Sequence, residues 1–223
     1  VDESAAIARA HGARPVLVDR SASLAQVLEA GRAVCTAPFI ARMDGDDLMH
    51  KRRLVEDLAH LKTRPELALT SSRARLFPRT KISPGMHAYV LWQNAWLSHE
   101  DHARELWIEQ PLCHPTITFR ASALEEIGGY STGEYPEDYE LLMRMMLAGL
   151  RMEKRPVVRH LWRDHGARET YKESARMHRD AFAGVKAEAM IARYQVDARP
   201  LFVLGTGREA GRIMRPLTAR GVK

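Results

Sequence analysis

The chain has 223 residues, of which 45% are apolar and 28% are charged, and this balance excludes a disordered or fibrous protein. No apolar run approaches the roughly 18 residues that would predict a membrane span. With 34 basic and 28 acidic residues the net charge is +6, which favours an anionic partner: a nucleotide, a phosphorylated lipid, a membrane surface or nucleic acid.

The first part of the chain alternates between helical and strand patterns. A capped, Ala-rich segment predicts a helix at residues 2–10, and apolar spacing predicts helices at 24–33 and 51–63. Short apolar runs predict strands at residues 16–18, 39–43 and 67–71. This alternation predicts an α/β fold with a mostly parallel sheet flanked by helices.

The middle of the chain is less regular. Residues 78–85 are expected to form a loop, and helical spacing continues over residues 86–108. A strand is predicted at 116–119, short helices at 121–127 and 136–149, and a longer one at 174–194. The basic stretch 151–168 is open to three interpretations: a solvated face, a diphosphate clamp or a contact with a membrane surface.

The C-terminal residues change character. A strand at 201–204 is followed by Gly205, Gly207 and Ala210 and then by helical spacing, which fits a dinucleotide-binding fingerprint. The acidic residue that this fingerprint needs about 20 positions later would fall beyond residue 223. Cofactor binding by these three residues and simple strand–helix packing are both open. We expect residues 1–197 to form one domain and 198–223 to begin a second, Rossmann-like unit.

The two cysteines, Cys35 and Cys113, are too few for a disulfide framework, and their spacing is not that of a metal site. A reducing, cytoplasmic location is the expectation, with peripheral contact at the inner face of the membrane as an extension of it.

Three carboxylates, Asp44, Asp46 and Asp47, follow the strand predicted at 39–43. Strand ends are where ligands bind in open α/β sheets. Close carboxylates repel one another unless a cation neutralises them, and oxygen ligands of this kind suit Mg²⁺ or Mn²⁺ together with substrate phosphates. The alternative is an acidic start to the helix that follows.

Glu137 and Asp138 form a second acidic pair, in the first turn of the helix that begins near Pro136. Acidic residues are common in that position, so a purely structural role is one interpretation. The other is a general base, held on a rigid element near the first acidic cluster.

The order of the motifs is more specific than any one of them. Residues 39–47 (FIARMDGDD) are followed by 113–116 (CHPT), 128–130 (GGY) and 137–141 (EDYEL). This order resembles the family 2 glycosyltransferases of the GT-A fold, over residues 1 to about 165.

The resemblance implies roles for the donor side of a site. Asp44 and Asp46 match the DxD pair, with Asp44 near the nucleotide sugar and Asp46 as a metal ligand. Asp47 matches a further acidic residue often found there. His165 is similar to a later histidine that completes the metal shell, although the usual serine pattern after it is replaced by residues 166–170.

The resemblance also implies an acceptor side. Asp138 matches the catalytic base and Glu137 its neighbour at the acceptor. His114 falls where the family often has a histidine beside the acceptor or the diphosphate, and we place Arg163 with it.

The implied activity is a metal-dependent, inverting transfer of a sugar from a nucleotide-sugar donor to a glycan or lipid-linked acceptor during polysaccharide assembly, with Mg²⁺ or Mn²⁺ and without nucleic acid. The family begins with a strand, a turn and a second strand, and residues 2–4 resemble only the end of that segment. We therefore expect the first strand to be missing and donor binding to be weak. The rival hypotheses are a nucleotide-dependent oxidoreductase built on residues 201–223 and, from the basic charge alone, a nucleic-acid-binding module.

Overall fold

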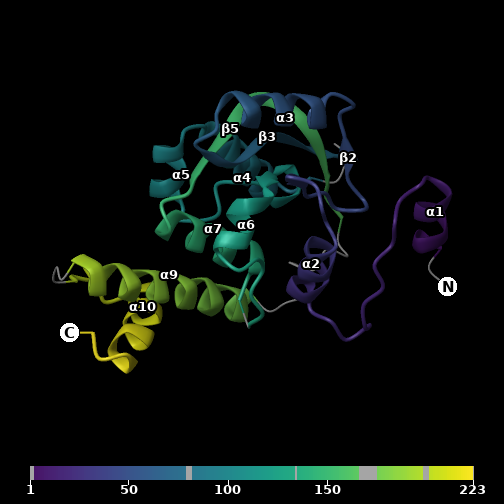
Figure 1. Cartoon of the computed structure of the whole chain (residues 1–223). Helices are drawn as coiled ribbons and strands as arrows, with labels where there is room; N and C mark the ends of the chain where they lie inside the picture. The colour runs from purple at the N-terminus through teal and green to yellow at the C-terminus, as the bar shows by residue number, and fades with distance from the viewer. Residues whose placement is uncertain (1–2, 79–81, 134, 166–174, 198–200, 223) are drawn as a thin grey trace.

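The computed structural model describes residues 3–78, 82–133, 135–165, 175–197 and 201–222 (Figure 1). The helices are α1 (Ser4–Ala10), α2 (Leu24–Ala33), α3 (Arg53–Thr63), α4 (Pro84–Ala95), α5 (His99–Glu105), α6 (Ala121–Glu126), α7 (Glu137–Leu147), α9 (Ala175–Asp197) and α10 (Arg208–Ala219), with a 3₁₀ turn, η2, at His114–Thr116. The strands are β1 (Phe39–Ala41), β2 (Leu48–Met49), β3 (Leu67–Phe77), β4 (Thr118–Arg120) and β5 (Arg151–Arg163).

The strands form one sheet in the order β1-β4-β3-β5-β2. The α/β class is confirmed, but the expectation of a mostly parallel sheet is wrong in detail. Within the described residues β3 and β5 pair in parallel, whereas β1–β4, β3–β4 and β2–β5 are antiparallel. The chain from β3 to β5 contains the helices that a parallel crossover needs, while short strands can add to an edge antiparallel without one.

The sheet has one polar and one apolar face, because successive residues of a strand point to opposite sides. Leu69 of β3 and Phe119 of β4 are buried in the main hydrophobic core, which includes residues of α6 and α7. On the other face, the Thr118 hydroxyl donates a hydrogen bond to Asp57 of α3 at 2.8 Å. Helix α3 lies over this polar face, at the top of Figure 1, and α6 and α7 lie below the sheet.

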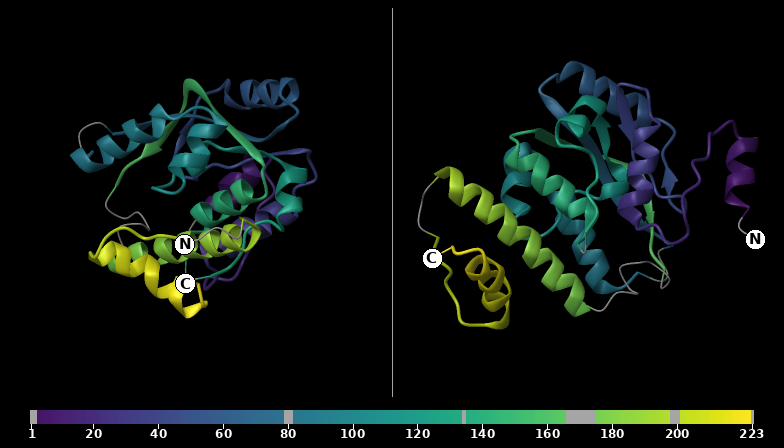
Figure 2. Two further views of the ribbon diagram at one scale, coloured as in Figure 1. Left: turned by 90° about the vertical axis from the view of Figure 1, so that its left-hand side faces the viewer. Right: turned by 60° about the horizontal axis from the view of Figure 1, so that its bottom comes forward.

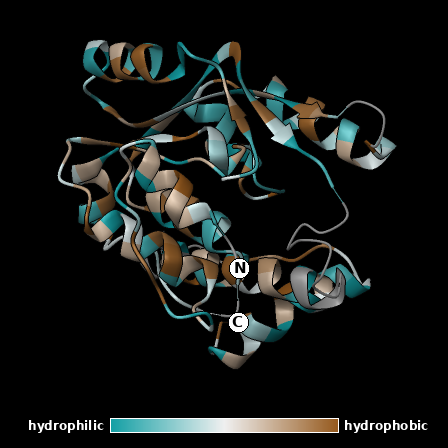
Figure 3. Cartoon of the chain, turned by 90° about the vertical axis from the view of Figure 1, so that its right-hand side faces the viewer, coloured by the Kyte–Doolittle hydropathy of each residue, from teal (hydrophilic) through white to brown (hydrophobic). Residues whose placement is uncertain are grey.

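Helix boundaries follow their capping residues. The helix expected over 86–108 is interrupted: α4 ends before Trp96, and α5 begins after Ser98. Ser98 and Asp101 form a capping box, in which each side chain bonds to the other's backbone N–H, and this starts a new helix. In Figure 3 brown and teal bands alternate around the helices, as expected where one side of a helix is buried and the other is exposed.

Two predicted strands are absent from the described residues, and one observed long strand was not predicted. Residues 16–18 and 201–204 form no strand; Leu17 is 76% exposed and Leu204 97% exposed, so neither run has a sheet to bury it. The basic stretch 151–163 is instead strand β5. Its basic residues obscured the strand pattern in the sequence, because Arg155 and Arg159 are paired with Glu56 of α3 and not exposed as isolated charges.

The C-terminal helices pack below the sheet layer. The rings of Tyr139 (α7) and Phe182 (α9) lie 4.4 Å apart between centroids. Helix α10 runs beside α9 (Figure 2), and the two share a small core of Ala187, Ile191 and Leu217. Within the described residues, no helix combines the length and the apolar character needed to cross a membrane.

Candidate active site

A large cleft of about 1880 Å³ lies between the strand ends, the start of α7 and one side of α9. Asp44 and Asp46 line it together with Glu137 and Asp138. The two acidic sites, about 90 residues apart in sequence, therefore open into one cavity. Because both sites open into the same cavity, one substrate bound at the first site could meet another bound at the second, as a two-substrate reaction requires.

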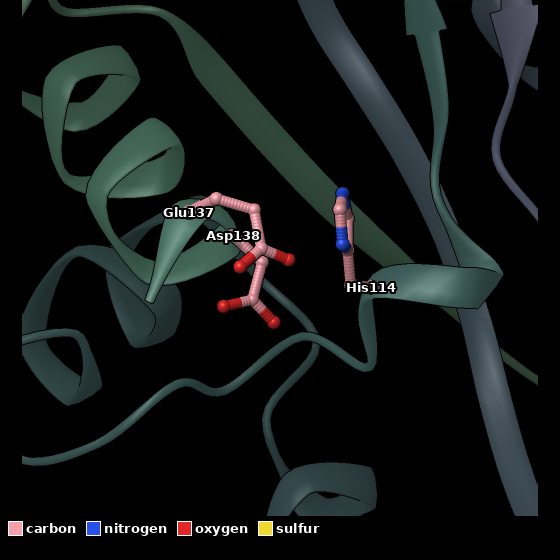
Figure 4. Close-up of side chains that lie close together, drawn as sticks. All are labelled: His114, Glu137 and Asp138. Atoms are coloured by element: carbon pink, nitrogen blue, oxygen red, sulfur yellow. The ribbon is translucent and has the colours of Figure 1, made fainter. Parts of the chain in front are cut away.

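The base side of the cleft, which we define as His114, Glu137 and Asp138, is shown in Figure 4. The two carboxylates come from the first turn of α7, and His114 faces them from η2. One nitrogen or oxygen atom from each residue lies within 4.8 Å of the others. His114 Nε2 is 2.8 Å from the Tyr130 hydroxyl, and burial holds the pKa of His114 well below its ordinary value. The imidazole is thus neutral and anchored.

Both oxygens of Asp138 accept hydrogen bonds. The backbone N–H of Tyr139 donates to Oδ1 at 2.8 Å, and Gln110 Nε2 donates to Oδ2 at 2.7 Å. Burial raises the pKa of Asp138, opposed by the Tyr139 N–H, by the charge of Arg42 and by Gln110. Burial, reinforced by the charge of Asp138, raises the pKa of Glu137 to about 7. Such displaced values are typical of acid–base sites.

Arg42 joins the two sides of the cleft and was not predicted. Its side chain is 9% exposed and pairs with Asp44 at 2.7 Å. Its positive charge also acts on Glu137 and Asp138, where it favours the ionised carboxylates. The signal available in the sequence was a lone arginine within the otherwise apolar run FIARM, since a charge in a short buried strand needs a partner.

The donor side of the cleft, which we define as Asp44, Asp46 and His165, is more open. Asp46 Oδ2 is 3.0 Å from His165 Nε2, with side chains 48% and 37% exposed. Arg163 Nε donates to the backbone carbonyl of Asp46 at 2.6 Å, which fixes that residue against the end of β5. A carboxylate beside an imidazole, both open to a cleft, is a donor set that fits a divalent ion whose other ligands come from substrate phosphates and water.

Asp47 has a different environment from its neighbours. It is buried, with Oδ2 at 2.7 Å from His160 Nε2 and Oδ1 accepting the backbone N–H of Arg163 at 2.7 Å. Asp47 therefore ties the acidic loop to β5, and it is not among the residues that line the cleft. Its predicted contact with the donor stays a prediction.

Gly205, Gly207 and Ala210 lie apart from the cleft. Gly205 has a positive φ of 134° and Gly207 caps α10. None of the three lines the cleft in the described part of the chain. The fingerprint requires a strand at 201–204 and none is formed there, which argues against the oxidoreductase alternative.

The chain is similar in sequence to two bacterial glycosyltransferases. It is 27% identical over 134 residues to the amylovoran biosynthesis glycosyltransferase AmsE of Erwinia amylovora, an alignment covering 60% of this chain and 48% of AmsE. It is 24% identical over 141 residues to an uncharacterized glycosyltransferase of Haemophilus influenzae, covering 63% of this chain and 50% of that protein. The chain thus spans about half the length of these curated relatives. No protein-family profile matches it.

Two solved structures that contain nucleotide sugars share the fold. S. aureus TarS 1–349 in complex with UDP-GlcNAc superimposes with a TM-score of 0.62 at 11% identity, over 100% of this chain and 70% of TarS 1–349. The mannosyltransferase PcManGT from Pyrobaculum calidifontis, in complex with GDP-Man and Mn²⁺, gives 0.52 at 16% identity, over 99% and 63%. The expected GT-A-like fold is therefore confirmed, and the chain resembles glycosyltransferases in both sequence and fold.

Proposed function

We propose that the protein transfers a sugar from a nucleotide-sugar donor to a hydroxyl of a glycan or lipid-linked acceptor, with inversion at the anomeric carbon. The observation that carries this proposal is the opening of two separate acidic sites into one cleft. The similarity to AmsE, whose name refers to amylovoran biosynthesis, supports polysaccharide assembly as the setting. The family 2 resemblance of the motif order supports the same activity.

Asp138 is the general base in this proposal. Its carboxylate takes the proton of the acceptor hydroxyl as that oxygen attacks the anomeric carbon, and one direct displacement inverts the configuration. The start of α7 and the nearby Arg42 both favour the ionised carboxylate that this step requires. Glu137 and the neutral imidazole of His114 line the same end of the cleft and orient the acceptor.

Asp46 and His165 would hold a divalent ion, Mg²⁺ or Mn²⁺, and Asp44 would contact the donor. When bound, such an ion neutralises the negative charge that develops on the departing nucleoside diphosphate. Arg163, which lines the cleft beside Asp46, provides a fixed positive charge at the same end. A structure of PcManGT contains GDP-Man and Mn²⁺ together, and this supports the presence of a metal with the donor.

The test is release of nucleoside diphosphate from UDP-GlcNAc and GDP-mannose, with Mn²⁺, with Mg²⁺ and with EDTA. Asp138→Asn and Asp46→Asn should strongly reduce release, whereas Glu126→Gln, at an exposed position of α6, should leave it unchanged. Full activity in Asp138→Asn would contradict the proposal.

A further inference from the structure

Gln110 is the side chain that fixes the second oxygen of Asp138. It lies between α5 and η2 and is 5% exposed, and its Nε2 lies 2.7 Å from Asp138 Oδ2. Oδ1 already accepts the Tyr139 N–H of the carboxylate's own helix. Gln110 therefore supplies the contact from outside α7, and the two donors together define the plane of the carboxylate.

The backbone of Gln110 is itself held from two other elements. Gln93 Nε2 of α4 donates to the Gln110 carbonyl at 3.0 Å. Lys154 Nζ of β5 donates to the carbonyl of the next residue, Pro111, at 2.8 Å. These contacts leave the segment little freedom to move, so the amide of Gln110 is presented to Asp138 from a rigid support.

The carbonyl oxygen of the Gln110 side chain, Oε1, is not stabilised by its surroundings. Within the described residues, Oε1 is buried and has no hydrogen-bond partner. A buried carbonyl without a partner is destabilising, so packing alone would favour an apolar side chain here. The Gln110 amide donates to Asp138 while its own carbonyl oxygen makes no hydrogen bond, which indicates a role in the site and not in packing.

We propose that Gln110 is a positioning residue for Asp138, holding the carboxylate with one lone pair of Oδ2 free for the acceptor proton. This inference rests on the proposed function of Asp138 as the base. The hydrogen bond also favours the ionised carboxylate, together with Arg42, whereas burial and the charge of Glu137 oppose it. Tyr130 and neutral His114 are further titratable groups close to Asp138, and the charge of Asp44 acts on the neighbouring Glu137.

The decisive measurement is the titration midpoint of the Asp138 carboxyl carbon by ¹³C NMR, with its resonance identified by its absence in Asp138→Asn. Removing the donor in Gln110→Ala should raise the midpoint by about one pH unit. Gln110→Glu, which keeps the shape but adds a negative charge, should raise it further and serves where the alanine variant does not fold. The matched control is Asn94→Ala, because the Asn94 amide bonds to the backbone of Ala74. This control should lower the melting temperature without moving the midpoint.

A second measurement is the pH profile of nucleoside diphosphate release, and in particular its acidic limb, where activity rises with pH. In both Gln110 variants that limb should move to higher pH with the NMR midpoint. An unchanged midpoint overturns the proposal, and so does a midpoint that moves while the acidic limb stays. Activity that survives in Asp138→Asn overturns instead the role of Asp138 as base, and the NMR midpoint still reports whether Gln110 controls the carboxylate.

Discussion

At the base side of the cleft the partly buried Asp138 accepts hydrogen bonds on both oxygens, whereas on the donor side the Asp46 side chain is 48% exposed and lies beside His165. The first arrangement is fixed by a backbone donor from α7 and a side-chain donor from the segment between α5 and η2 before any substrate binds. The second leaves a carboxylate and an imidazole open to solvent.

The difference follows from what each side must do. A general base works only in one geometry and at one protonation state, so internal contacts that set both are useful. A donor site receives a ligand that brings its own charge and, in our proposal, a metal ion. Rigid internal pairing there would compete with the ligand.

The largest effect is expected at the base. Asp138→Asn keeps the shape and the Tyr139 contact but removes the proton acceptor, so sugar transfer should fall by about 10²–10⁴-fold. The free energy of unfolding should stay the same or rise, because a partly buried charge is removed. Steady-state kinetics and denaturant unfolding measure the two quantities. A variant that loses both activity and stability would show that Asp138 is structural.

The acidic loop should separate function from stability within two neighbouring residues. Asp47→Ala leaves the buried His160 ring and the Arg163 N–H without their partner and should lower the free energy of unfolding by about 3 kcal/mol. Asp46→Ala, at an exposed site, should change it by less than about 0.5 kcal/mol. The same Asp46→Ala variant should lose at least about tenfold in metal-dependent donor turnover. Equal stability losses in the two variants would remove the distinction between them.

The base side should also make the free energy of unfolding depend on pH. Because the folded-state pKa of Glu137 is about 7, above its ordinary value of 4.5, the folded state binds the proton more tightly than the unfolded state. Stability should therefore fall as pH rises from about 4.5 to about 7, by about 1–2 kcal/mol after allowance for solvent. Glu137→Gln should flatten this part of the curve. Unfolding measured at several pH values tests it, and parallel curves would contradict the assignment.

Local sequence pattern anticipated a good deal of the base side. Residues 137–141 were placed on a helix after Pro136, and α7 begins there. The helices predicted at 24–33 and 51–63 were also close to α2 and α3. These elements are defined by apolar periodicity within about a dozen residues, so one sequence is enough to find them.

The contacts that complete the site come from distant parts of the chain and could not be predicted. Gln110 bonds to Asp138 and the charge of Arg42 acts on Asp138 only in the folded chain, and a lone glutamine in a loop has no pattern. Strand β5 was missed because its arginines are neutralised by Glu56 of α3, about 100 residues away. From sequence alone an arginine is assigned to the solvent-exposed surface unless its acidic partner is known.

The smallest effect concerns the turn that carries Tyr130, the partner of His114. Gly128 and Gly129 both have positive φ, 77° and 71°, so alanine at either position should cost about 1 kcal/mol of backbone strain. At Gly129 an added Cβ would also lie 2.6 Å from Arg32 Nε and closer still to the Glu29 carboxylate. That carboxylate accepts the Tyr130 N–H at 2.9 Å.

Gly129→Ala must therefore push the Glu29–Arg32 pair aside, and it should destabilise the protein by about 1 kcal/mol more than Gly128→Ala, which meets no atom within 4 Å. The displaced Tyr130 would release His114 and lower sugar transfer, without changing donor binding. Unfolding curves and donor titrations on the two variants make the comparison. Equal stability and equal activity in both would mean that the turn does not support the base side, and that His114 is held by η2 alone.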